Sequence, residues 1–123
     1  MEESPHKGKP SLTRVWNALS YSLAGLTAAF RHEAAFRLEV VLAAILIPAA
    51  LLMPASGLGK AAMVAAVLLV LIVELFNAAV EATVDRISLE THPLAKRAKD
   101  IGSAAVFVSL VNVVAVWLLV LFG

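Results

Sequence analysis

Long stretches without charge constrain the fold of this chain more than any other feature. No charged residue occurs from Val40 to Gly59, from Ala61 to Val73, or from Ile101 to Gly123. A helix needs about 20 mostly apolar residues to cross a bilayer. Hydrophobic residues also make up 61% of the chain, above the roughly 45–50% apolar share of soluble domains. We therefore predict an all-α integral membrane protein, a single domain over residues 1–123 with transmembrane helices at 34–54, 60–87 and 101–122.

A different pattern precedes the first predicted span. Residues 1–10 hold prolines and a glycine among charged residues, which predicts a flexible tail. From 11 to 32, apolar residues recur at helical spacing with polar residues between them. This pattern predicts an amphipathic helix in the membrane interface, with Ser11 as its N-cap.

Prolines and glycines predict where the later helices begin and end. Pro54 with Gly57 and Gly59 is typical of a turn between the first two spans. Pro93 suits the first turn of the helix that becomes the third span, because a proline at that position lacks only an N–H that would be unpaired anyway.

Basic residues predict the orientation in the membrane. They gather before the first span and between the second and third, whereas Lys60 stands alone in the other loop and none follows Ile101. Because cytoplasmic segments carry the excess of Lys and Arg, we expect a cytoplasmic N-terminus and an outward Gly123. A net charge of +1 does not suggest a nucleic-acid binder. The absence of cysteine excludes disulfides and thiolate metal sites.

Four polar residues in the second span are the most informative for function. Glu74, Asn77, Glu81 and Asp85 follow one another at spacings of three, four and four, which places them on one face of a helix. A carboxylate at the depth expected for Glu74 costs a few kcal/mol unless it is paired, hydrated or protonated, so such residues are usually functional. The alternative is that Glu74 and Asn77 only join neighbouring helices.

Other charged residues should meet this face at the cytoplasmic interface. Glu33 and Glu39 lie where the amphipathic helix joins the first span, and Lys99 and Asp100 lie just before the third span. Converging carboxylates suit Mg²⁺, and a lysine suits phosphates. The alternative for the basic residues is orientation and contact with anionic lipids. No phosphate-binding loop or dinucleotide fingerprint is present, so these residues predict a Mg²⁺-competent site without specifying its reaction.

Three segments together resemble the bacterial diacylglycerol kinase family, which also includes undecaprenol kinases. Residues 74–86 are similar to its E-x-x-N-x-x-x-E-x-x-x-D motif, 97–105 to its second motif, and 33–37 to its entry to the first span. The resemblance implies phosphorylation of diacylglycerol to phosphatidate by ATP in the bacterial inner membrane. It also implies a homotrimer with active sites shared between subunits.

The resemblance implies a role for each site residue. Glu74 would be the general base and would contact the lipid. Glu33 and Glu81 would hold Mg²⁺. The nucleotide would be bound by Arg14, Tyr21, Glu33, Asn77, Glu81, Asp85, Lys99 and Asp100. The lipid would be bound by Ser22, Arg37, Glu74, Lys99 and Ser103.

Alternatives to diacylglycerol phosphorylation follow from other features. Residues 92–96 look closer to the undecaprenol kinases, which would keep the mechanism and change the lipid. A small proton-coupled transporter subunit would also explain an intramembrane Glu74, but it leaves the basic residues at 96–99 without a task. A helical interaction protein, with Asn112 as the contact on span three, leaves the cost of Glu74 unexplained.

Overall fold

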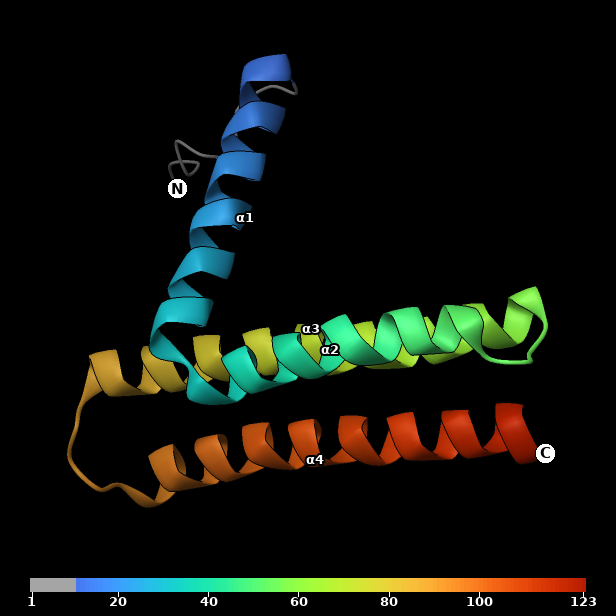
Figure 1. Cartoon of the computed structure of the whole chain (residues 1–123). Helices are drawn as coiled ribbons and strands as arrows, with labels where there is room; N and C mark the ends of the chain where they lie inside the picture. The colour runs from blue at the N-terminus through green and yellow to red at the C-terminus, as the bar shows by residue number, and fades with distance from the viewer. Residues whose placement is uncertain (1–10) are drawn as a thin grey trace.

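The computed structural model describes residues 11–123, and the regular structure in that range is entirely helical (Figure 1). Helices α2, α3 and α4 are long and apolar enough to cross a membrane. This confirms the predicted fold class. The predicted tail, residues 1–10, lies outside the described residues. The helices are α1 (Leu12–His32), α2 (Ala34–Leu52), α3 (Gly57–Ile87) and α4 (Pro93–Phe122).

Helix α1 projects away from the bundle that α2, α3 and α4 form (Figure 1). The Ser11 side-chain oxygen accepts a hydrogen bond from the Arg14 backbone N–H at 3.2 Å, as an N-cap does. Ala29, in the last turns, is the residue of α1 that is buried. The apolar side chains nearer the N-terminus of α1 stay exposed, and Trp16, for example, is 69% exposed. The helix therefore joins the bundle through its C-terminal end only.

A sharp corner at Glu33 separates α1 from α2. Glu33 has extended backbone angles, φ −113° and ψ 104°, and it ends one helix and begins the next. The corner leaves carbonyls at the end of α1 without helical partners. The Arg37 guanidinium donates from Nη1 to the carbonyls of Phe30 and Arg31, both at 2.9 Å. Arg37 thus stabilises the corner that fixes where Glu33 lies.

Helix α3 is central, since it packs against both α2 and α4. Phe36, Ala43 and Ala50 are buried at every seventh position of α2. Small side chains such as these two alanines let membrane helices approach closely. Between α3 and α4, the Trp117 indole N–H donates to the Met63 carbonyl at 3.2 Å. This packing holds the two long helices side by side along their length (Figure 1).

The helix starts differ in one place from the sequence prediction. Gly57 and Gly59, expected in the turn after Pro54, belong to the first turn of α3. That prediction was wrong because Ser56 caps the helix ahead of them, its side-chain oxygen accepting from the Gly59 N–H at 3.0 Å. Pro93 occupies the first turn of α4, as predicted, behind a His92 N-cap.

Candidate active site

The four polar residues predicted to share a face of α3 continue the buried line of that helix. Met63 and Val70 are buried in its first half. Glu74 follows on the same side and is only 6% exposed. Asn77 and Glu81 are half-buried, and Asp85 is exposed. The line therefore runs from a buried carboxyl group to one that solvent reaches.

Asn77 joins the two acids of this line. Its side-chain Nδ2 donates to Glu74 Oε2 at 3.3 Å and to Glu81 Oε1 at 3.2 Å. An amide carries two N–H donors, so both bonds form at once. Bonds to carboxylates are among the stronger hydrogen bonds in proteins. One neutral side chain thus fixes the positions of two acids that lie about two turns apart on α3.

Helix α4 comes close to Asn77 at Gly102. A Cβ added at Gly102 would overlap Asn77 Oδ1 and lie 3.2 Å from Asn77 Cγ. The same Oδ1 is buried and accepts no hydrogen bond from residues 11–123. The amide is therefore held by the two acids on one side and by the α4 backbone on the other.

Ion pairs lie at the exposed end of the line. Lys99 Nζ lies 2.7 Å from Asp85 Oδ1 and so connects α4 to α3. Lys96 Nζ lies 2.6 Å from Asp100 Oδ2 within α4. The side chains of both pairs are well exposed, which leaves the two lysines accessible to a phosphate-bearing ligand. Asp85, Lys99 and Asp100 line a single hollow, which brings together three residues predicted to bind the nucleotide.

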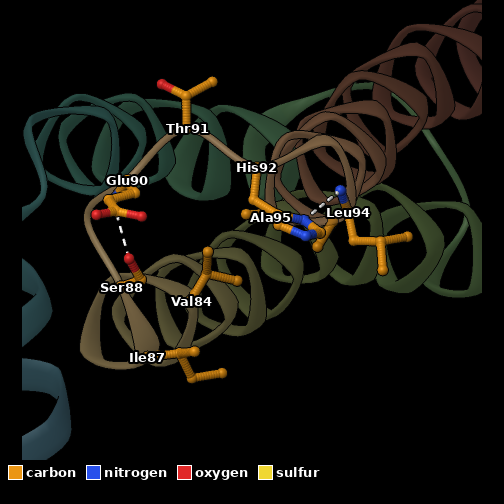
Figure 2. A pocket seen from close by; sticks show the side chains of 9 residues that line it. Val84, Ile87, Ser88, Glu90, Thr91, His92, Leu94 and Ala95 are labelled. Atoms are coloured by element: carbon orange, nitrogen blue, oxygen red, sulfur yellow. Dashed lines mark hydrogen bonds between the residues drawn. The ribbon is translucent and has the colours of Figure 1, made fainter.

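A second hollow adjoins this one at the turn between α3 and α4 (Figure 2). Ser88, Glu90, Thr91 and His92 line it beside apolar residues. Two hydrogen bonds order the turn. The Glu90 N–H donates to Ser88 Oγ and the Leu94 N–H donates to His92 Nδ1, both at 3.0 Å. None of these residues was among the predicted site residues, although polar side chains follow directly after the acidic motif in the sequence.

A third, mostly apolar hollow separates α1 from α3. Ser22, His32 and Glu33 contribute polar groups, and Ala78 and Ala82 contribute the facing wall. The Ser22 hydroxyl donates to the Ala18 carbonyl at 3.0 Å. The predicted lipid-binding Ser22 and the predicted metal-binding Glu33 therefore share one hollow, whose α3 wall is formed by Leu75, Ala78, Ala79 and Ala82 and does not include Glu81.

Several predicted site residues stand apart from these hollows. Arg14 and Tyr21 lie on the projecting part of α1, where Tyr21 is 61% exposed. Ser103 lies on an exposed part of α4. The Arg37 guanidinium is bonded to the end of α1. A single chain therefore gathers only part of the predicted set.

The acidic residues suit a metal ion that binds together with a substrate better than one that the protein holds by itself. Residues 11–123 contain no group of three or more histidine, aspartate or glutamate side chains placed to hold an ion. Mg²⁺ is commonly bound through one or two carboxylates together with substrate phosphates. Glu33 and Glu81 are each partly exposed, and so they remain accessible to such an ion.

Comparison with known proteins identifies the family. The sequence profile of prokaryotic diacylglycerol kinase matches residues 20–121. The chain is 56% identical over 123 residues to a diacylglycerol kinase of Pseudomonas aeruginosa, with both chains covered completely. It is 49% identical over 111 residues to that of Haemophilus influenzae, covering 90% of this chain and 94% of the relative. For Escherichia coli K12 the identity is 42% over 111 residues, covering 90% and 91%. These matches confirm the resemblance seen in the motifs: the chain belongs to the prokaryotic diacylglycerol kinase family.

Proposed function

We propose that this chain transfers the γ-phosphoryl group of ATP to the hydroxyl of diacylglycerol, giving phosphatidate and ADP at the bacterial inner membrane. The observation that carries the proposal is the line of Glu74, Asn77, Glu81 and Asp85, which is buried at one end and exposed at the other. A lipid hydroxyl approaches from the buried end and a nucleotide from the exposed end. The names of the relatives support the lipid class.

Glu74 is the candidate general base. It is the buried acid of the line, and its Oε2 is held by Asn77. As the lipid oxygen attacks the γ-phosphorus, the hydroxyl proton passes to the Glu74 carboxylate. General-base catalysis of this kind contributes about 10²- to 10⁴-fold in rate. The bond between the γ-phosphorus and the ADP oxygen then breaks, and ADP leaves.

The nucleotide is proposed to occupy the exposed end. Phosphoryl transfer needs positioning and charge neutralisation more than covalent chemistry. Lys99 offers the positive charge for phosphates, and its partner Asp85 positions it. The hollow at the α3–α4 turn has polar groups for the rest of the nucleotide (Figure 2). Glu33 and Glu81 would hold Mg²⁺, which supplies charge neutralisation when it is bound.

Assembly and orientation complete the proposal. We expect a homotrimer whose active sites take residues from neighbouring subunits, with the N-terminus in the cytoplasm. One observation supports assembly. Predicted site residues such as Tyr21 and Ser103 stand apart from the line in one chain.

The proposal is tested by following ADP release from Mg²⁺-ATP in lipid–detergent micelles, with diacylglycerol and undecaprenol offered separately. We expect stimulation by diacylglycerol alone, a phosphorylated lipid product, and no turnover when Mg²⁺ is omitted. Stimulation by undecaprenol alone would contradict the assignment of diacylglycerol as the substrate, but it would still support phosphoryl transfer from ATP to a lipid. No ADP release with either lipid, from protein whose helical content is intact, would overturn the proposed function.

A further inference from the structure

The position of Glu33 depends on the corner between α1 and α2. Its backbone serves both helices, since its N–H donates to the Ala29 carbonyl at 2.9 Å and its carbonyl accepts from the Arg37 N–H at 3.1 Å. Its side chain makes no capping hydrogen bond, which leaves the carboxylate available to a ligand. Where that carboxylate lies is therefore decided by how the end of α1 is fixed.

Little of α1 packs against the bundle. Ala29, in its last turns, is the residue of α1 that is buried, and a hollow lined by Ser22 and Ala78 separates the helix from α3. A helix also ends with four carbonyl groups that have no partner within it. An end with few buried contacts and unpaired carbonyls opens easily. Hydrogen bonds from outside α1 are therefore needed to hold this end in place.

Arg37 supplies such bonds from α2. Its Nη1 carries two N–H donors, and these reach the carbonyls of Phe30 and Arg31, both at 2.9 Å. A positive charge is favourable beside the C-terminal end of a helix, where the helix dipole is negative. The same rule disfavours a cation in the first turn of α2, where Arg37 lies. The interaction with α1 is therefore what makes this position suitable for an arginine.

We infer that Arg37 is a positioning residue, which fixes the end of α1 so that the Glu33 carboxylate is held for Mg²⁺, and that it does not bind the lipid. The inference rests on the proposed metal role of Glu33. It gives Arg37 a different task from the lipid contact that the family resemblance implied. A displacement of about 1 Å within a site can cost about 100-fold in rate. A corner that opens should therefore weaken the use of Mg²⁺ and leave lipid binding unchanged.

Three variants separate positioning from lipid binding. Arg37→Met removes the donors and keeps a long side chain. Arg37→Lys keeps the charge but is one atom shorter, so we expect it to keep one of the two bonds. Arg31→Met is the matched control, because it removes a positive charge beside the corner and leaves the backbone carbonyl of that residue in place. Arg31 is exposed and has no proposed role in the site.

Hydrogen exchange of backbone amides measures the corner directly, in micelles that contain neither ATP nor Mg²⁺. Amides exchange when local structure opens, so a less stable helix end exchanges faster. We expect the amides of residues 29–33 to exchange faster in Arg37→Met than in the wild type. Arg37→Lys should lie between these two, and Arg31→Met should match the wild type. A role of Arg37 in lipid binding would change none of these rates.

Kinetics then separate the metal from the lipid. For each variant with wild-type helical content, the measurements are the free Mg²⁺ concentration at half-maximal rate and the KM for diacylglycerol. We expect the Mg²⁺ concentration to rise about 10-fold or more in Arg37→Met, the change that corresponds to one lost hydrogen bond to a charged group. The rise should be smaller in Arg37→Lys and absent in Arg31→Met. The KM for diacylglycerol should keep its wild-type value in all three.

The outcomes distinguish this inference from the proposed function. Unchanged exchange at residues 29–33 in folded Arg37→Met, or an unchanged Mg²⁺ requirement, would overturn the role of Arg37. A raised KM for diacylglycerol would return Arg37 to the lipid site. If Arg37→Met does not fold, Arg37→Lys decides by the same measurements. If the proposed function is wrong, the wild type itself releases no ADP with either lipid. A wild-type Mg²⁺ requirement in Glu33→Gln would remove the metal role of Glu33, and this inference with it.

Discussion

Gly102→Ala tests how α4 positions the acids of α3. The new Cβ would overlap Asn77 Oδ1 and lie 3.2 Å from Asn77 Cγ, so the amide must move. Moving it lengthens or breaks the bonds to Glu74 and Glu81, which are 3.3 and 3.2 Å long. Forcing an extra methyl group into a packed site costs about 1–3 kcal/mol. Losing one bond to a carboxylate costs about 1.5–3 kcal/mol.

The rate effect follows from these magnitudes. If one bond is lost in the transition state, kcat/KM should fall about 10- to 150-fold. The assay is ADP release with diacylglycerol and Mg²⁺-ATP, measured with the unfolding midpoint of the same samples. Gly57→Ala is the matched control, because its Cβ would meet no atom within 4 Å. Unchanged kcat/KM in Gly102→Ala would refute the argument that α4 holds Asn77 in place.

Two further substitutions test the ends of the α3–α4 packing. Lys99→Met should raise the KM for ATP about 10-fold or more, with little change in stability because its pair with Asp85 is exposed. Lys60→Met is the control, and equal KM values for the two variants would contradict the phosphate role. Trp117→Phe removes the bond to the Met63 carbonyl and should lower stability by about 1 kcal/mol. Denaturation in mixed micelles measures this, and an unchanged midpoint would show that the bond contributes nothing.

Features that depend on local chemistry were predictable from the sequence. Long apolar stretches indicated the three candidate spans because length and hydropathy alone decide them. The Ser11 cap and the start of α4 at Pro93 followed from local hydrogen bonding and from the missing proline N–H. The wrong prediction at Gly57 and Gly59 has a local cause too. The N-cap hydrogen bond of Ser56 starts the helix there and outweighs the preference of glycine for turns.

Contacts between helices could not be predicted in this way. Periodicity placed Glu74, Asn77 and Glu81 on one face, but it does not say which helix that face meets. The approach of Gly102 to Asn77 and the ion pair of Lys99 with Asp85 depend on the rotation and register of the helices. These are set by the summed packing of many side chains. The hollow at Ser88 to His92 likewise forms only when α4 folds back beside α3.

Glu74→Gln provides the most direct test of the account. The change keeps the size of the side chain and a possible bond to Asn77, but it removes the carboxylate that accepts the proton. The measurement is phosphatidate formation from diacylglycerol and Mg²⁺-ATP by protein whose unfolding midpoint matches the wild type. We predict a fall in kcat of about 10²- to 10⁴-fold, the usual contribution of a general base. A rate within a few-fold of wild type would contradict the claim that the buried end of this line performs the chemistry.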